Sequence, residues 1–350
     1  MDLIKVKLSE LEGFFESVVF QLFTVKPISP LRVKSYVENP RANADDTVLY
    51  MFVENGELIA FRTVLSDCIG KNTPFGWCSG VWVKPEFRGQ KLSVKLLHEA
   101  LNDWNNRLMF TNYAPTSEFC NLSVQRFKVL KKRTGLRFYL YPDFKKMYKE
   151  RKSYFKPFFP LLSATVRGIS FLKSLVLPAK APKFVELNSL DEDCRSFLRN
   201  SPATYFNRKE PELDWIIKFP WITSDEYSNF MYPFSFAKID YSLKIVKVFD
   251  DNSFVGFFVY TIVNAKMKLI YHFFETNKEN LLVNAVTVLA RKNKIAYLNI
   301  LDPLLAKLFR EKSRCFAFSK TISSHIYSSL GIENEQNLTI FDGDGDNCFT

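Results

Sequence analysis

The alternation of apolar and polar residues predicts an α/β unit in the first 141 residues. Its clearest element is a hairpin, because two apolar runs flank Asn55-Gly56, a pair that favours a two-residue turn. A helix is predicted where apolar side chains recur with helical spacing between Leu92 and Trp104. The full predicted order is β-α-β-β-β-α-β-α-β: strand and helix in 1–24, strands 47–54, 58–65 and 76–84, helix 92–104, strand 107–113, helix 117–132 and strand 137–141.

A similar order of elements recurs after residue 183. Asp251-Asn252 is the predicted turn of a second hairpin, and strands and amphipathic helices follow it as in the first unit. An internal duplication of about 150 to 170 residues fits this pattern, although few residues are identical between the halves. The predicted elements are strand 183–187, helix 191–200, strands 245–250, 253–262 and 267–274, helix 281–292, strand 295–301, helix 303–310 and strand 338–341.

The chain is therefore expected to form two α/β domains, 1–144 and 181–350, each a mixed sheet flanked by helices. The connector, 145–180, is basic and apolar, and Pro157, Pro160 and Pro178 interrupt it. Two interpretations of its stretch 161–177 stay open. It is either a helix packed between the domains or an interfacial amphipathic helix, which would bring peripheral membrane contact.

Composition supports a folded protein inside the cell. Hydrophobic residues make up 47% of the 350 residues, which is too many for a disordered chain. No run of about 18 uncharged apolar residues indicates a spanning helix. The N-terminus does not resemble a signal peptide. Six scattered cysteines without a CxxC motif, together with three histidines, give no metal-site pattern and suggest reduced thiols in the cytoplasm.

The net charge of +11 favours an anionic partner. Lys and Arg are densest between Arg126 and Lys152, yet no helix-turn-helix, zinc-finger or RNA-recognition pattern accompanies them. We therefore expect no nucleic-acid partner. A phosphate-bearing ligand is the better match, provided that the sequence offers a place to bind it.

One segment offers such a place. A strand runs into Pro85, and the polar loop Arg88-Gly89-Gln90-Lys91 then opens a helix. The first amides of a helix lack intrahelical partners, and the helix dipole adds positive potential, so this arrangement favours phosphate. Arg88 and Lys91 add formal charge. The loop is neither a Walker A loop nor a dinucleotide GxGxxG motif.

The same segment resembles the GNAT family of acetyl-CoA-dependent N-acetyltransferases. Val83-Lys84-Pro85 matches the family's V-x-P strand end, and Arg88-Gly89-Gln90 matches the start of its R/Q-x-x-G-x-G/A loop. Lys91 and Ser93 depart from the pattern, because the family has Gly and Gly or Ala there. The resemblance implies an acetyl-CoA cofactor and an amine acceptor, either a small molecule or a peptide. It implies cofactor contacts by Val81, Trp82, Val83, Arg88, Gly89, Gln90, Lys91, Leu92 and Ser93.

Acetyl transfer needs a polarised thioester carbonyl, a base for the amine and an acid for the leaving thiolate. The family's usual tyrosine acid is absent from 121–132, so Tyr113 is the nearest substitute. Asp67 is the candidate base, from the loop before the predicted strand 76–84. Weaker options are Glu86, His98, Ser117 and Ser123.

The second unit lacks the phosphate loop. Glu275 and Glu279 stand where phosphates would lie, so charge repulsion predicts that this half binds no CoA. Arg208 and Trp215, in an aromatic-rich segment, are candidates for an acceptor pocket, the alternative being inter-domain packing. The acidic run 342–347 is expected to be a solvated turn. An inactive tandem binding or scaffold protein is the alternative to an enzyme.

Overall fold

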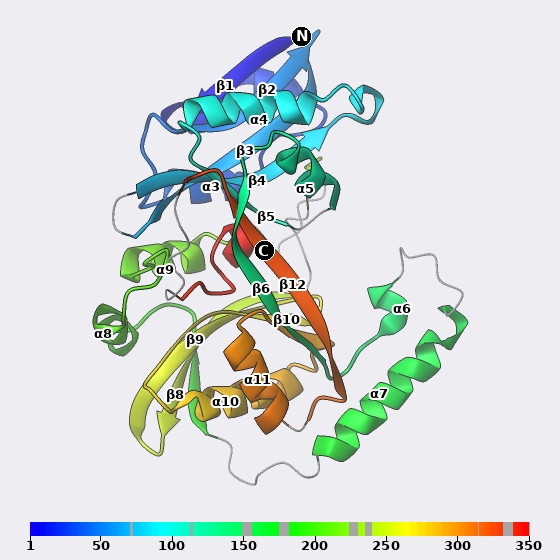
Figure 1. The fold of residues 1–350 in the computed structure, drawn as a ribbon, viewed down its shortest axis with the longest axis vertical. Coiled ribbons are helices and arrows are strands. Elements are labelled where there is room, and N and C mark those ends of the chain that lie inside the picture. Colours follow the sequence, from blue (N-terminus) through cyan, green and yellow to red (C-terminus); the bar gives the residue numbers. More distant parts are fainter. Residues whose placement is uncertain are drawn as a thin grey trace.

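The computed structural model describes residues 1–70, 73–112, 115–148, 156–174, 182–223, 230–234, 240–313, 315–331 and 339–349. Their strands form one mixed sheet of twelve strands, with helices on both faces (Figure 1). The strand order is β1-β2-β3-β4-β5-β12-β6-β11-β10-β9-β8-β7. This architecture confirms the predicted α/β class.

In the first half of the sheet, the first four strands pair antiparallel with their neighbours, and the fifth strand pairs in parallel with the fourth. Its two faces are buried by different helices. Leu49 and Met51 pack toward one set and Tyr50 toward the other, because neighbouring residues of a strand point to opposite faces. The strands are β1 (Asp2–Lys7), β2 (Thr47–Glu54), β3 (Glu57–Ile69), β4 (Thr73–Val83) and β5 (Leu108–Thr111). The helices are α1 (Leu11–Glu16), α2 (Val18–Leu22) and α3 (Pro30–Val37) on one face, and α4 (Leu92–Asp103) and α5 (Pro115–Leu122) on the other.

The second half of the sheet is also covered by helices on both faces. Ile245 and Phe257 share a core with α8 and α9, whereas Val246 and Phe258 pack under α10 and α11. The strands are β7 (Lys183–Leu187), β8 (Tyr241–Asp250), β9 (Ser253–Val263), β10 (Lys266–Phe274), β11 (Tyr297–Ile300) and β12 (Phe318–Ser328). The helices are α8 (Glu192–Asn200), α9 (Glu210–Lys218), α10 (Glu279–Lys292) and α11 (Pro303–Lys312).

The two halves exchange their last strands. β6 (Lys128–Tyr139) belongs to the first half in sequence but lies between β12 and β11. β12 belongs to the second half and lies between β6 and β5. Figure 1 shows these two long strands crossing the middle of the molecule. Backbone hydrogen bonds therefore run continuously from one half of the sheet into the other.

Two predicted elements are wrong. The helix predicted over 117–132 ends at Leu122, and its last residues belong to β6. Gln125 between them has a φ of 56°, a left-handed conformation that a right-handed helix cannot include. No strand is present over the described residues 339–341 either. Among the elements that were not predicted are α3, α9 and β12.

The connector contains α6 (Phe144–Met147), a short 3-10 helix (Lys156–Phe158) and α7 (Phe159–Ser174). α7 lies at the margin of the molecule (Figure 1). It buries Phe159 and Val166 beside Phe144 of α6 and two strand tyrosines. No helix within the described ranges has the length and apolar character needed to cross a bilayer.

The C-terminal segment contradicts the prediction of a solvated acidic turn. Asp344 is fully buried and Asp346 is 8% exposed. The short 3-10 helix Asp346–Phe349 brings Phe349 against two tryptophans, with ring centroids 4.7 Å from Trp221 and 4.8 Å from Trp215. The segment is thus part of the core between the halves. The remaining 3-10 helices are Leu8–Glu10 and Pro85–Phe87.

Candidate functional site

A pocket of about 740 Å³ lies where β4 ends and α4 begins, and α5 forms another of its walls. Its lining is largely apolar and contains Arg88 and Lys91, and none of the described residues that line it is acidic. Eight of the nine predicted cofactor residues line it, and Gln90 is the exception. The full lining is Val81, Trp82, Val83, Phe87, Arg88, Gly89, Lys91, Leu92, Ser93, Val94, Thr116, Ser117, Phe119, Cys120 and Ser123.

The pocket opens because β4 and β5 separate. The two strands pair in parallel only at Gly76 and Trp77, and β4 then continues to Val83 without β5 beside it. A β-bulge follows at Ser79, where the pairing with β3 skips one residue. The edge of β4 that would face β5 beyond this point therefore offers its peptide groups to the pocket.

The loop before α4 has the backbone shape of an anion site. Gly89 has a φ of 87°, and the N-cap Lys91 has a φ of 58° with no side-chain cap. Since no side chain caps the helix, its first amides are available to a ligand at its N-terminus. Arg88 and Lys91 are both exposed, so their charges add to the helix dipole.

Lys91 has a left-handed backbone conformation at the position where the family pattern has glycine. A left-handed residue favours glycine, and a residue with a Cβ costs about 1 kcal/mol or more there. The chain keeps the backbone path despite this cost. In exchange it gains a cation beside the N-terminus of α4.

Arg62, which was not predicted to have a role, lies behind the wall of the pocket. It lies on β3, is 1% exposed, and donates from Nη2 to the carbonyl oxygen of Ser93 (3.4 Å) and to Oδ1 of Asn121 (3.0 Å). These contacts tie β3 to the first turn of α4 and to α5. They also place a positive charge beneath the pocket. An arginine within a strand pattern gives no local signal that it will be buried.

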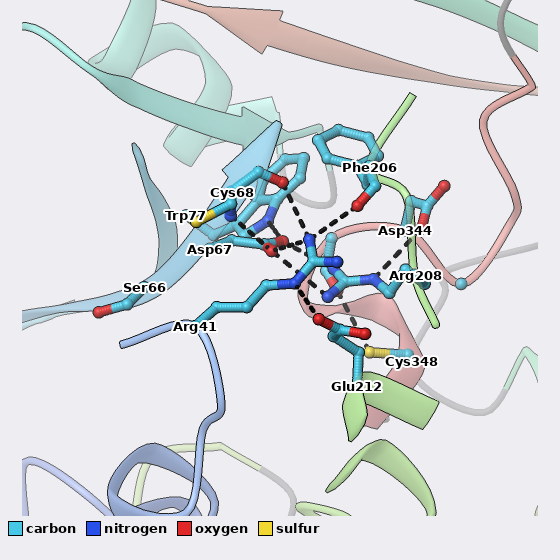
Figure 2. Close-up of polar contacts among 12 residues, drawn as sticks. Arg41, Ser66, Asp67, Cys68, Trp77, Phe206, Arg208, Glu212, Asp344 and Cys348 are labelled. Atoms are coloured by element: carbon cyan, nitrogen blue, oxygen red, sulfur yellow. Dashed lines mark hydrogen bonds and ion pairs between the residues drawn. The ribbon is translucent and has the colours of Figure 1, made fainter. Parts of the chain in front are cut away.

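Asp67, the predicted base, lies in a buried ion cluster and not in the pocket lining (Figure 2). Its Oδ1 accepts from Arg41 Nη1 at 3.0 Å, and its Oδ2 accepts from Arg208 Nη2 at 2.6 Å and from Trp77 Nε1 at 2.7 Å. Burial alone would raise the pKa of Asp67, but Arg208 and Arg41 hold it below its usual value. A carboxylate held ionised by two arginines is a poor proton acceptor.

The two predicted acceptor residues are also buried between the halves. Arg208 forms an ion pair with Asp67, and its Nε lies 3.5 Å from Oδ1 of Asp344. Trp215 donates from Nε1 to the carbonyl oxygen of Ser35 at 2.6 Å and packs on Phe349. Neither lines the pocket at α4.

The other candidates have mixed positions. Ser117 and Ser123 line the pocket, whereas His98 and Glu86 are exposed elsewhere on the surface. Tyr113, the predicted acid, lies outside the described residues. Within the described ranges, no group of three or more histidine, cysteine or acidic side chains is placed to hold a metal ion.

The second half contains the equivalent strand separation, but a segment of the chain fills it. β10 pairs with β11 only through Lys266–Lys268, and a bulge follows at Ile270, two residues after the last parallel pair. In β4 the bulge at Ser79 likewise lies two residues after Trp77, the last residue paired with β5. There the amide of Gly343 donates to the carbonyl oxygen of Ile270 at 2.8 Å. A Cβ on Gly343 would lie 2.8 Å from that oxygen, so the fit is tight. The C-terminal segment thus occupies the edge that stays open in the first half.

Comparison with solved structures supports the fold. N-myristoyltransferase from Saccharomyces cerevisiae, with bound myristoyl-CoA, superimposes with a TM-score of 0.53 at 13% identity, covering 95% of this chain and 83% of that one. A conserved protein of unknown function from Enterococcus faecalis V583 gives a TM-score of 0.48 at 10% identity, covering 93% and 72%. No protein-family model and no curated protein matches the sequence. The chain has the GNAT fold, as its loop motif suggested.

Proposed function

We propose that this protein is an acyltransferase that moves an acyl group from acyl-CoA to an amine. The observation that carries the proposal is the open pocket at the strand separation, which joins the apolar edge of β4 to the cationic N-terminus of α4. Its volume of about 740 Å³ lies within the usual range for cofactor pockets. Acetyl-CoA is the donor that the loop motif favours.

The residues present fit CoA at both ends of the pocket. Arg88, Lys91 and the first amides of α4 would hold the phosphates, because all three bring positive potential to one exposed place. Val81 and Val83 would contact the less polar part through the free edge of β4. When bound, acyl-CoA would supply a thioester whose carbonyl is open to attack by an amine, with CoA thiolate as the leaving group.

The same edge of β4 can assist the reaction. A backbone N–H between Ser79 and Val83 would donate to the carbonyl oxygen as negative charge develops on it. The buried charge of Arg62 strengthens the positive potential under this region. We propose that a pocket residue or Tyr113 protonates the thiolate, and that the base is not Asp67, because its oxygens already accept from two arginines.

Calorimetric titration with CoA and acetyl-CoA tests the binding step. Arg88→Ala is expected to weaken binding at least tenfold, since one charge-assisted phosphate contact contributes about 1.5–3 kcal/mol. Lys95→Ala is the matched control, because Lys95 is an exposed lysine one turn further along α4 and does not line the pocket. Equal effects of the two substitutions, or no binding by the wild-type protein at high micromolar ligand, would refute the proposed site.

The alternative function is a GNAT-fold binding or scaffold protein without activity. The observation that favours it is the lining of the pocket, because the described residues there include no carboxylate or histidine to act as a base. Release of free CoA thiol in the presence of a panel of amines and peptides distinguishes the two. Acetyl-CoA and myristoyl-CoA should each be tested as the acyl donor. Amine-dependent thiol release supports the enzyme, and binding without release supports the alternative.

A further inference from the structure

α7 turns an apolar face to the solvent. Its inner face buries Phe159, Ser163, Val166 and Ser170, which recur with helical spacing. The outer face carries large apolar side chains that are between 40% and 68% exposed: Phe158 just before the helix, and Leu161, Leu162, Ile169 and Leu172 within it. Thr165 lies among them, so no charged residue interrupts this stripe.

This stripe is not needed to hold α7 on the protein. The inner face already packs against Tyr139, Phe144 and Tyr297, and Lys173 Nζ donates to the carbonyl oxygens of Phe316 and Ala317. A continuous row of exposed large apolar side chains marks a surface that meets another apolar medium. Figure 1 shows α7 at the margin of the molecule, where a flat surface can reach it.

The charges around α7 are mostly positive. From residue 144 to residue 185 the sequence carries ten lysines or arginines and a single acid, Glu150. Among the described residues, Lys145, Lys146, Arg167 and Lys173 are exposed and no acidic side chain accompanies them between 144 and 185. An apolar stripe bordered mainly by cations is complementary to an interface of acyl chains under anionic headgroups. Asp143, the N-cap of α6, is an acid next to this region in sequence, and its side chain accepts from the amide of Lys146.

A pocket at the C-terminal end of α7 also combines basic with apolar side chains. It measures about 390 Å³ and is lined by Lys173 and Arg310 together with Phe316 and Phe318, and no acidic side chain is among the described residues of its lining. It adjoins the apolar stripe through Lys173, the last basic residue of the helix. A phosphate headgroup would meet two cations there while apolar side chains lie beside them.

We propose that α7 docks this protein on the surface of an anionic phospholipid bilayer. The stripe formed by Phe158, Leu161, Leu162, Ile169 and Leu172 enters the interface, and the surrounding lysines and arginines contact the headgroups. The contact is peripheral and salt-sensitive. It is independent of the acyltransferase proposal, because no residue of α7 lines the pocket at α4.

Co-sedimentation with vesicles tests this docking. The full-length protein is mixed with vesicles of phosphatidylcholine containing about 30 mol% phosphatidylserine, and in parallel with pure phosphatidylcholine, at low and high salt. The test variant is the double substitution Leu161→Glu and Leu172→Glu. Leu22→Glu on α2 is the matched control, because Leu22 is an equally exposed leucine (73%) on another helix. Circular dichroism and melting curves verify that all variants are folded.

We expect the wild-type protein and Leu22→Glu to bind the anionic vesicles, with at least tenfold weaker binding to neutral vesicles or at high salt. The double variant should lose at least tenfold in binding to the anionic vesicles. The proposal is overturned if the wild-type protein does not bind, or if the double variant binds equally well. It is also overturned if sedimentation without lipid shows a dimer that the double variant dissociates, since the stripe would then be a contact between two copies.

Discussion

Replacing Asp67 with Asn tests the ion cluster that joins the two halves. Asp67 lies on β3 of the first half, and Arg208, 141 residues further along the chain, belongs to the second. Both side chains are 2% exposed. Asn keeps the shape of the side chain but removes its charge. Asn also replaces one carboxylate oxygen with an NH2 group, which can only donate. At the position of Oδ2 this group would face the donors of Arg208 and Trp77.

The expected loss is about 3–5 kcal/mol in the free energy of unfolding, the usual cost of removing one partner from a buried ion pair. Asp344 compensates Arg208 only in part, because its Oδ1 lies 3.5 Å away and burial raises the pKa of Asp344 to about 6. The loss is a large fraction of an ordinary domain stability of about 5–15 kcal/mol. We therefore expect the two halves to separate more readily.

Urea unfolding followed by tryptophan fluorescence measures this loss, since Trp77 donates directly to Asp67. Asp214→Asn is the matched control. Asp214 pairs with Arg195 on the surface, its side chain is 38% exposed, and exposed pairs contribute about 1 kcal/mol or less. A loss in Asp67→Asn no larger than that in Asp214→Asn would refute the reasoning.

The pH dependence gives a second readout for Asp67. Because its pKa is held below the usual value by Arg208 and Arg41, against burial, its ionised form stabilises the folded protein. This contribution is fully present above the unfolded pKa of about 4 and is lost as the pH falls through the lower folded value. The difference between wild type and Asp67→Asn should therefore be largest at neutral pH and shrink below pH 4.

Three further predictions concern single positions. Burial raises the pKa of Asp342 to about 7, so the folded state retains a proton that the unfolded state loses near pH 4, and wild-type stability should fall between these values by up to about 1.4 kcal/mol per pH unit. Asp342→Asn should remove that slope and be more stable than wild type at pH 8 in chemical unfolding; a variant less stable than wild type there contradicts this. Gly135→Ala should lower the free energy of unfolding by about 1–3 kcal/mol or more, because its Cβ would lie 1.9 Å from the carbonyl oxygen of Ile300. The control Gly168→Ala on α7 places a Cβ with nothing within 4 Å and should be neutral or stabilising. Equal melting temperatures of the two variants would disprove the clash. Lys91→Gly should raise thermal stability by relieving about 1 kcal/mol of left-handed strain while weakening CoA binding through the lost charge, and a gain in affinity would show that the lysine obstructs the site.

Several features of the site follow from short stretches of sequence. Asn55-Gly56 forms the predicted turn with both φ values positive, 52° and 78°. The step from β4 through Pro85 to the start of α4 is likewise local, because proline ends the strand and the polar loop leaves the helix amides free. The pocket residues Val81–Ser93 lie within a few residues of each other in sequence. This proximity is the reason that a motif identified most of the lining.

Other features depend on residues far apart in the chain, and no local pattern encodes them. The exchange of β6 and β12 was not predicted, since the pairing of Phe318 with Tyr139 joins strands about 180 residues apart and each strand reads as ordinary amphipathic sequence. Asp67 had no visible partner until Arg41 and Arg208 were placed beside it, so a structural carboxylate resembled a catalytic one. The run 342–347 looked solvated because acids usually are, and only the tertiary fold shows Asp344 buried beside Arg208.

The sequence by itself thus determined the α/β class, the first hairpin turn and the start of α4, because these depend on hydrophobic periodicity, turn residues and a helix start. The tertiary structure alone decided that the strand separation stays open in the first half and is closed in the second. That difference comes from the C-terminal segment, which reaches back to β10 and donates from Gly343 to Ile270. A contact between residues more than 70 positions apart is fixed by packing and hydrogen bonding in three dimensions, which the local sequence around β10 does not record.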